Sequence, residues 1–198
     1  FMSFDPGDIA AGLEAIGIPV IVHGTAFTLD AAYGQWEQTG AVTGHVADAA
    51  RLVADAQSDI AMAVESVGDS GNGVTYYYEI ENTFYSATSN SFIGQLLAPM
   101  GLVNIADQAP DPEGYGFPQL SAEYIVDADP DLILLADAGA GESAVTVAAR
   151  PGWDTMTAVT TGGIVELDND IASRWGPRIV QLVVTVADAV NGLVAAES

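Results

Sequence analysis

Apolar residues recur along the chain with two spacings, and these predict helices alternating with short buried strands. The longest helical pattern covers residues 43–67, with Thr43 at the position expected for the N-cap. Its apolar positions, separated by steps of three and four, are Val46, Ala49, Val53, Ala56, Ile60, Ala63 and Val67. At ~1.5 Å per residue this helix is on the order of 35 Å long. Such a length suits a helix that joins two parts of the chain.

After residue 73 the alternation of strands and helices becomes regular, which is typical of parallel βαβ units. Continuous apolar runs predict buried strands at Val74–Ile80, Leu132–Ala136 and Ile164–Leu167. Helices are expected at 91–100, 121–128 and 153–159, and from 177 to the end of the chain. The last helix is expected to turn one apolar face inward, formed by Ile179, Val183, Val186, Val190 and Val194.

The first 42 residues are less regular. They predict a short helix at Asp8–Ile16, one strand at Ile18–Val22 and a helix from Leu29 to about Gly40. One strand cannot form a sheet by itself, so this part is interpreted as the remnant of an N-terminal lobe. Together with the glycine-rich break at 68–73, the pattern predicts three regions. They are a remnant of the N-terminal lobe (1–42), an inter-lobe helix and linker (43–73), and a complete C-terminal α/β lobe (74–198).

Composition narrows the possible functions. The chain is 49% hydrophobic, which is enough to bury a core and excludes disorder. Its 27 acidic residues face four arginines and no lysine, for a formal net charge of −23. This charge repels phosphate backbones and anionic lipids, so nucleic-acid partners are not expected. It leaves open a cationic partner, an environment of high salt, or an acidic surface that maintains solubility. Without cysteine the chain forms no disulfide and has no thiolate nucleophile.

Catalytic and metal-binding signatures are scarce. The chain has no G-x-S-x-G, H-E-x-x-H or Walker motif, and its two histidines, His23 and His45, are far apart in sequence. Residues 127–131 (DADPD) imitate the start of a calcium loop. An EF-hand needs Gly at its sixth position and Glu at its twelfth, where this chain has Leu132 and Ala138. We therefore expect no catalytic residue, no metal site and no cofactor.

One motif keeps an enzymatic alternative open. Residues 139–144 (GAGESA) follow a predicted strand and fit the G-x-G-x-x-A pattern of dinucleotide-binding loops. Against this interpretation, Glu142 would face the pyrophosphate, and Arg150-Pro151-Gly152 interrupts the helix that should follow. A nucleotide-dependent small α/β enzyme that uses the Gly139–Ser143 loop is thus the alternative, and a flexible glycine-rich loop is the simpler interpretation.

Ligands of open α/β sheets bind at the loops that follow the carboxyl ends of the strands. Aromatic and hydroxyl residues in three such loops suit a large, partly apolar ligand. The ligand-binding candidates are Tyr85, Ser86, Trp153, Arg174 and Trp175. At least one of the two tryptophans is expected to fill the core instead. Arg174 stands before the last helix, so it needs an anionic neighbour, either a carboxylate or the ligand.

Several segments together resemble the substrate-binding proteins of ABC importers for ferric siderophores, haem and cobalamin, the class III periplasmic binding proteins. In chain order they are 13–20 (LEAIGIPV), 28–44 (ending GAVTG), 91–97 (SFIGQLL) with 101–106 (GLVNIA), 120–123 (LSAE) with 128–134 (ADPDLIL), 150–153 (RPGW) and 174–179 (RWGPRI). Each motif is weak, but their common order along nearly the whole chain is specific to this family.

The resemblance implies two Rossmann-like lobes with parallel sheets, joined by one long α-helix, and a metal chelate bound between them. It implies an extracytoplasmic solute receptor, periplasmic or lipid-anchored, that delivers its ligand, here first of all a ferric siderophore, to an ABC permease. Glu123 matches the glutamate with which the second lobe docks onto the permease. A simpler role for Glu123 is electrostatic stabilisation of a helix start beside Ser121.

The sequence departs from the family at its beginning, because the opening strands of the first lobe have no counterpart. The first lobe is therefore expected to be incomplete. Sheet edges left open in this way could pair two copies of the chain into a homodimer. A truncated interaction domain without ligand is a further alternative.

Overall fold

The computed structural model describes residues 5, 7–112, 114–139 and 141–196. Its centre is a parallel sheet in the order β2-β1-β3-β4. The register places Tyr77 opposite Ile133, and Ile133 opposite Ile164. The strands are β1 (Thr75–Glu79), β2 (Val103–Asn104), β3 (Leu132–Leu135) and β4 (Ile164–Glu166). The predicted α/β class with a parallel sheet is confirmed.

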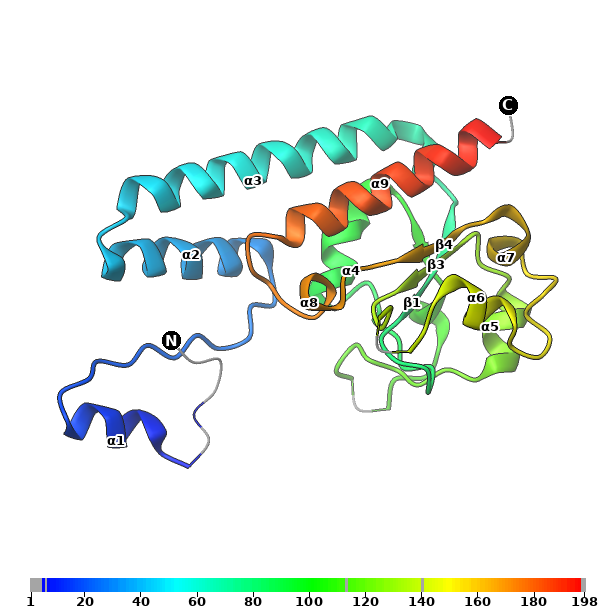
Figure 1. Cartoon of the computed structure of the whole chain (residues 1–198). Helices are drawn as coiled ribbons and strands as arrows, with labels where there is room; N and C mark the ends of the chain where they lie inside the picture. The colour runs from blue at the N-terminus through cyan, green and yellow to red at the C-terminus, as the bar shows by residue number, and fades with distance from the viewer. Residues whose placement is uncertain (1–4, 6, 113, 140, 197–198) are drawn as a thin grey trace.

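Helices cover both faces of this sheet (Figure 1). The helices of the described residues are α1 (Ile9–Ala15), α2 (Leu29–Thr43), α3 (Val46–Val67), α4 (Phe92–Leu97), α5 (Ala122–Ala128), α6 (Ala144–Ala148), α7 (Thr157–Thr161), α8 (Asn169–Ala172) and α9 (Ile179–Ala196), of which α1 takes no part in covering the sheet. Short 3₁₀ segments occupy Gly68–Gly71, Ala98–Met100 and Ile105–Gln108.

Successive residues of β1 point to opposite faces of the sheet, as the period of two in a strand requires. Tyr76 and Tyr78 join a hydrophobic cluster formed with α2, α3, α4, α8 and α9. Tyr77 joins a second cluster, formed with α5, α6 and α7 on the other face. Because both faces of the sheet are covered, its central strands consist of continuous apolar runs.

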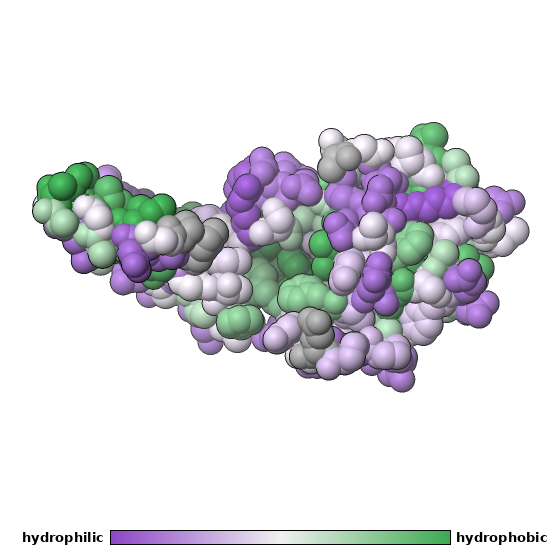
Figure 2. Space-filling view, turned by 90° about the horizontal axis from the view of Figure 1, so that it is seen from below, coloured by the Kyte–Doolittle hydropathy of each residue, from purple (hydrophilic) through white to green (hydrophobic). Residues whose placement is uncertain are grey.

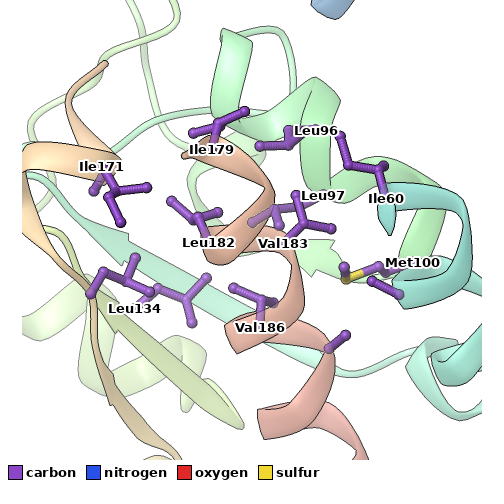
Figure 3. Packing of buried hydrophobic residues seen from close by; sticks show 14 of the residues in the cluster. Ile60, Leu96, Leu97, Met100, Leu134, Ile171, Ile179, Leu182, Val183 and Val186 are labelled. Atoms are coloured by element: carbon purple, nitrogen blue, oxygen red, sulfur yellow. The ribbon is translucent and has the colours of Figure 1, made fainter. Parts of the chain in front are cut away.

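The long helix α3 packs along α9 and α2 (Figure 1). Six of the seven predicted positions are buried, and only Val46 in the first turn is exposed. Figure 3 shows the contact, where Ile60 of α3 points toward the cluster around Val183 and Leu97. The division of the chain at residues 42/43 and 73/74 stays a prediction.

The expected N-cap of α3 is wrong. Thr43 does not cap α3; it is the last residue of α2, and its hydroxyl donates to the Thr39 carbonyl. Gly44, with a φ of 78°, ends α2 in the left-handed conformation, and His45 stands at the N-cap of α3. The turn at Gly44 therefore moves the N-cap of α3 two residues later than predicted, from Thr43 to His45.

The predicted strand at 18–22 does not form. Ile18 and Val22 are exposed, and Val22 alone takes part in a bridge. A lone strand gains no ladder of hydrogen bonds, so its backbone stays irregular. The helix α1 forms where predicted but buries none of its residues, and with the segment after it extends away from the rest of the molecule (Figure 1).

The short elements β2 and α6 were not predicted, and the predicted inward position of Val194 is wrong. The strand β2 has two residues and the helix α6 has five, too few for a periodic pattern. Val194 is exposed because the last turns of α9 extend past the sheet. The edge strands β2 and β4 contain two and three residues, and short edges offer few backbone groups to a second copy. The homodimer through sheet edges stays a prediction.

Candidate functional site

A cavity of about 350 Å³ opens at the carboxyl ends of β1 and β3. Ile80 follows β1 and Ala136 follows β3, and both line its floor. Figure 2 shows a hollow on this face with hydrophobic side chains inside it. The aromatic residues of the wall are Phe27, Tyr78, Phe92, Tyr115, Phe117 and Trp175. A cavity with this lining suits a ligand with a large apolar surface.

Hydrogen bonds between distant segments hold the aromatic wall in place. The Trp36 Nε1 donates to the Trp175 carbonyl at 3.0 Å, and the Trp175 Nε1 donates to Gln35 Oε1 at 2.8 Å. The Tyr78 hydroxyl donates to the Ala172 carbonyl at 3.3 Å. The helix α2 therefore fixes the loop before α9, although the two segments are about 140 residues apart in sequence.

The loop at residues 107–119 carries Tyr115 and Phe117 into the cavity wall. Asp111 stabilises this loop, because one of its carboxylate oxygens accepts the backbone N–H of Gly116 at 2.7 Å. Gly116 has a φ of 80°, and a Cβ there would lie 3.0 Å from the Thr88 hydroxyl oxygen. Glycine therefore allows both the turn and its close approach to the loop after β1.

Arg174 is the only charged residue among the described residues that line the cavity. Its guanidinium pairs with the Asp170 carboxylate one turn earlier, and both side chains are 64% exposed. The hydrogen bond from Arg174 lowers the pKa of Asp170, which keeps the pair ionised. The sequence left open whether a carboxylate or a ligand partners Arg174, and in this structure the partner is the carboxylate.

The structure brings together two of the five predicted ligand-binding residues, Arg174 and Trp175. Tyr85, Ser86 and Trp153 are not among the residues that line this cavity. Ser86 is buried, and Tyr85 is exposed and bridges to Glu81 and Gln119.

Trp153 is 1% exposed and packs in the second hydrophobic cluster, so it is the tryptophan that fills the core. It lies there because Arg150 and Phe84 cover it, with the Phe84 ring stacked at 5.9 Å. Glu123 is exposed in the first turn of α5, on the face of the sheet away from α3 and α9.

Sequence reasoning missed Phe27, Phe92, Tyr115 and Phe117 as lining residues. The only signal for the last two was their aromatic character within a loop rich in proline and glycine. Phe92 is the first residue of α4, where Ser91 caps the helix by accepting the Gly94 N–H.

A buried ion-pair cluster lies at the same ends of β1 and β3. The Arg150 guanidinium donates to both carboxylate oxygens of Glu79 at 2.6 Å each, and to Glu142 at 2.8 Å. Its centre lies 4.7 Å from the Trp153 ring. Burial, and then the negative charge of Glu79, raise the pKa of Asp137 to about 6.

This cluster includes Glu142 of the glycine-rich loop at 139–143. Within that loop, Ala140 lies outside the described residues. Glu142 accepts hydrogen bonds from Arg150, Asn82 and Thr146, so its carboxylate is held within the ion-pair cluster and keeps a negative charge in this loop. Ser143 caps α6, which has five residues. A dinucleotide loop instead leaves its amides open toward a pyrophosphate at the start of a longer helix.

The described residues show neither a cluster of metal ligands nor a membrane-spanning helix. They contain no group of three or more His, Cys, Asp or Glu side chains placed to hold a metal ion. Within the same ranges, none of the helices has the length and apolar character that crossing a membrane requires.

Comparison with known proteins gives consistent relationships. The sequence model described as "Periplasmic binding protein" matches residues 4–171. A cobalamin-binding protein of Halobacterium salinarum (strain ATCC 700922 / JCM 11081 / NRC-1) is 29% identical over 180 residues, which are 89% of this chain and 48% of the relative. The uncharacterised ABC transporter substrate-binding lipoprotein YvrC of Bacillus subtilis (strain 168) is 27% identical over 188 residues, covering 92% and 57%. The chain spans about half the length of the curated relatives it matches.

Solved structures share the fold. The periplasmic haem-binding protein RhuT from Roseiflexus sp. RS-1 superposes with a TM-score of 0.77 at 23% identity, over 95% of this chain and 73% of that chain. The periplasmic vitamin B12 binding protein BtuF of Vibrio cholerae superposes with a TM-score of 0.66 at 18% identity, over 95% and 71%.

Proposed function

Because the chain belongs to the periplasmic binding protein family, we propose that it is the solute-binding component of an ABC importer for a metal chelate. The chelate is of the siderophore, haem or cobalamin class, and it binds without covalent chemistry. The observation that carries this proposal is the aromatic cavity at the carboxyl ends of β1 and β3. Its matched relatives are binding proteins, which supports binding over catalysis.

The aromatic wall explains how such a cavity would hold a chelate. Trp175 and Phe117 are half-buried or exposed in the free protein, so a ligand that covers them removes apolar surface from water. Full burial of one large apolar side chain is worth about 1.5–3 kcal/mol. Two or three rings of this kind supply a substantial part of the free energy of a micromolar complex, about −8 kcal/mol.

Isothermal titration calorimetry with a ferric hydroxamate, haemin and cyanocobalamin tests the proposal. Trp175→Ala and Phe117→Ala should each weaken the chelate that binds by roughly 10-fold or more. Tyr85→Ala is the informative comparison, because the sequence places Tyr85 at the ligand and the geometry places it outside the cavity. Loss of affinity in Tyr85→Ala with none in Trp175→Ala would move the site away from this cavity. No heat with any chelate would refute the proposed function.

We further propose that the protein acts outside the cytoplasm and that Glu123 contacts the permease. Glu123 is exposed and does not line the aromatic cavity, so a role in docking should leave ligand affinity unchanged. Glu123→Ala should therefore bind chelate normally but fail to stimulate the ATPase of its importer. The simpler role, stabilisation of the start of α5, instead predicts normal stimulation and a loss of about 0.3–1 kcal/mol in unfolding free energy.

A further inference from the structure

The balance of charge at the cavity carries an inference about its ligand. Arg174 is the only cationic side chain among the described lining residues, and Asp170 already neutralises it. The next arginine along the chain, Arg178, lies 3.8 Å from Asp168. Both arginines near the start of α9 therefore face a carboxylate, and neither presents a free positive charge to a ligand.

Acidic side chains line a second cavity that adjoins the aromatic cavity. A neighbouring cavity of about 640 Å³ shares Phe27, Asn90 and Tyr115 with the aromatic cavity, and Asp107 and Asp111 line it. Asp107 accepts the backbone N–H of Ser89 at 2.7 Å, and Asp111 accepts that of Gly116 at 2.7 Å, so hydrogen bonds hold both carboxylates in place at this cavity. The two cavities together thus have more negative than positive charge, within a chain whose formal net charge is −23.

These charges determine which ligands approach and bind. Like charges within a Debye length, about 10 Å at 0.1 M salt, repel both during encounter and in the complex. An anionic group in the cavity would also meet an arginine, Arg174, whose positive charge Asp170 already offsets. The negative charges do not weaken the binding of a neutral ligand. Such a ligand contacts aromatic rings and hydroxyl or amide groups such as those of Ser91, Asn90 and Asn169.

Resting on the proposed function, we propose that this cavity selects metal chelates that are uncharged or cationic and present an apolar face, and that it discriminates against anionic chelates. The discrimination comes from the Asp170–Arg174 pair and from the two aspartates of the neighbouring cavity. The selectivity is electrostatic, so it weakens as salt screens the charges.

Matched probes that differ only in charge test the inference on the full chain. One series is ferrioxamine B, which is cationic, with its N-acetyl (neutral) and N-succinyl (anionic) derivatives. The other pair is cyanocobalamin, which is neutral, and a monocarboxylate made from it by hydrolysis of one side-chain amide. In the series that binds, the anionic member should bind at least 10-fold more weakly at low salt. The difference should shrink several-fold in 1 M NaCl, with folding checked by circular dichroism at each salt concentration.

A substitution separates the Asp170–Arg174 pair from the overall charge of the chain. Asp170→Asn frees the Arg174 guanidinium at the cavity, so affinity for the anionic member should rise several-fold, while affinity for the neutral member stays the same. Asp168→Asn is the matched control, because it removes the same charge beside Arg178, which does not line the cavity. Its affinities should follow those of the unmodified chain.

The outcomes are distinct. Equal affinity for the charged and neutral members of a series, or no difference between Asp170→Asn and Asp168→Asn, overturns the charge selectivity and leaves the proposed function standing. Binding in neither series, together with no binding of haemin, from a chain that is folded, overturns the chelate-binding function itself and the selectivity with it.

Discussion

The ion pair between Glu79 and Arg150 offers the sharpest test of what holds the ends of the central strands. The Glu79 side chain is 0% exposed, and its two carboxylate oxygens each accept a hydrogen bond from Arg150 at 2.6 Å. Arg150→Met keeps a side chain of similar length but leaves Glu79 buried without a counter-charge. Removal of one partner of a buried pair costs about 3–5 kcal/mol. For a chain of this size the melting temperature, Tm, should fall by roughly 10 °C.

Urea denaturation at pH 7.5 and constant salt, followed by circular dichroism, measures this loss. Arg51→Met is the matched control, because Arg51 pairs with Asp48 at 3.3 Å on an exposed helix surface. An exposed pair of this kind contributes about 0–1 kcal/mol, so the control should unfold almost as the unmodified chain does.

The double variant Glu79→Gln/Arg150→Met distinguishes an unpaired charge from lost packing. It removes both charges, so it should recover most of the stability that Arg150→Met loses. A loss in Arg150→Met below about 1 kcal/mol would refute the reasoning. So would a double variant whose loss equals the sum of the two single losses, because additivity means that the partners do not interact.

Three further predictions concern pH, salt and packing. Burial raises the pKa of Asp137 to about 6, so its ionisation destabilises the fold as pH rises from about 4 to above 6. Asp137→Asn should raise the free energy of unfolding by up to about 2 kcal/mol more at pH 7.5 than at pH 4, and an equal effect at both pH values would contradict this. With a net charge of −23, Tm should rise between 0.1 and 2 M NaCl in differential scanning fluorimetry, and a constant or falling Tm would argue against self-repulsion. Ile60→Ala, at the contact of α3 with α9, should cost about 2–4 kcal/mol in urea denaturation, whereas the exposed Leu52→Ala on the same helix should cost less than 1.

The sequence was informative wherever a segment was long and its apolar residues periodic. The strands β1, β3 and β4 and the buried face of α3 lie within a residue or two of their predicted positions. Sequence was less informative for short or unpaired segments. The two residues of β2 form a strand only because β1 lies beside them, and residues 18–22 stay irregular because no neighbouring strand pairs with them along their length.

The residues of the candidate site were harder to predict from the sequence than the main strands were. Arg174 and Trp175 were found because they follow β4 at the edge where ligands of parallel sheets bind. Trp153 also follows a strand, β3, yet it is buried under Arg150 in the opposite layer. Nothing in the local sequence separates these two tryptophans, since each stands beside an arginine or glycine in a loop.

The sequence by itself therefore determined the α/β class, the parallel type of the sheet and the acidic character of the surface. Hydrophobic periodicity and charge are local properties, so they can be read from neighbouring residues. Only the tertiary structure decided which aromatic rings form the cavity and which carboxylate pairs with the arginine that lines it. Loop side chains take their direction from contacts such as Trp36 with Trp175, between residues 139 positions apart. No periodic pattern encodes such contacts, because they exist only once the layers have packed.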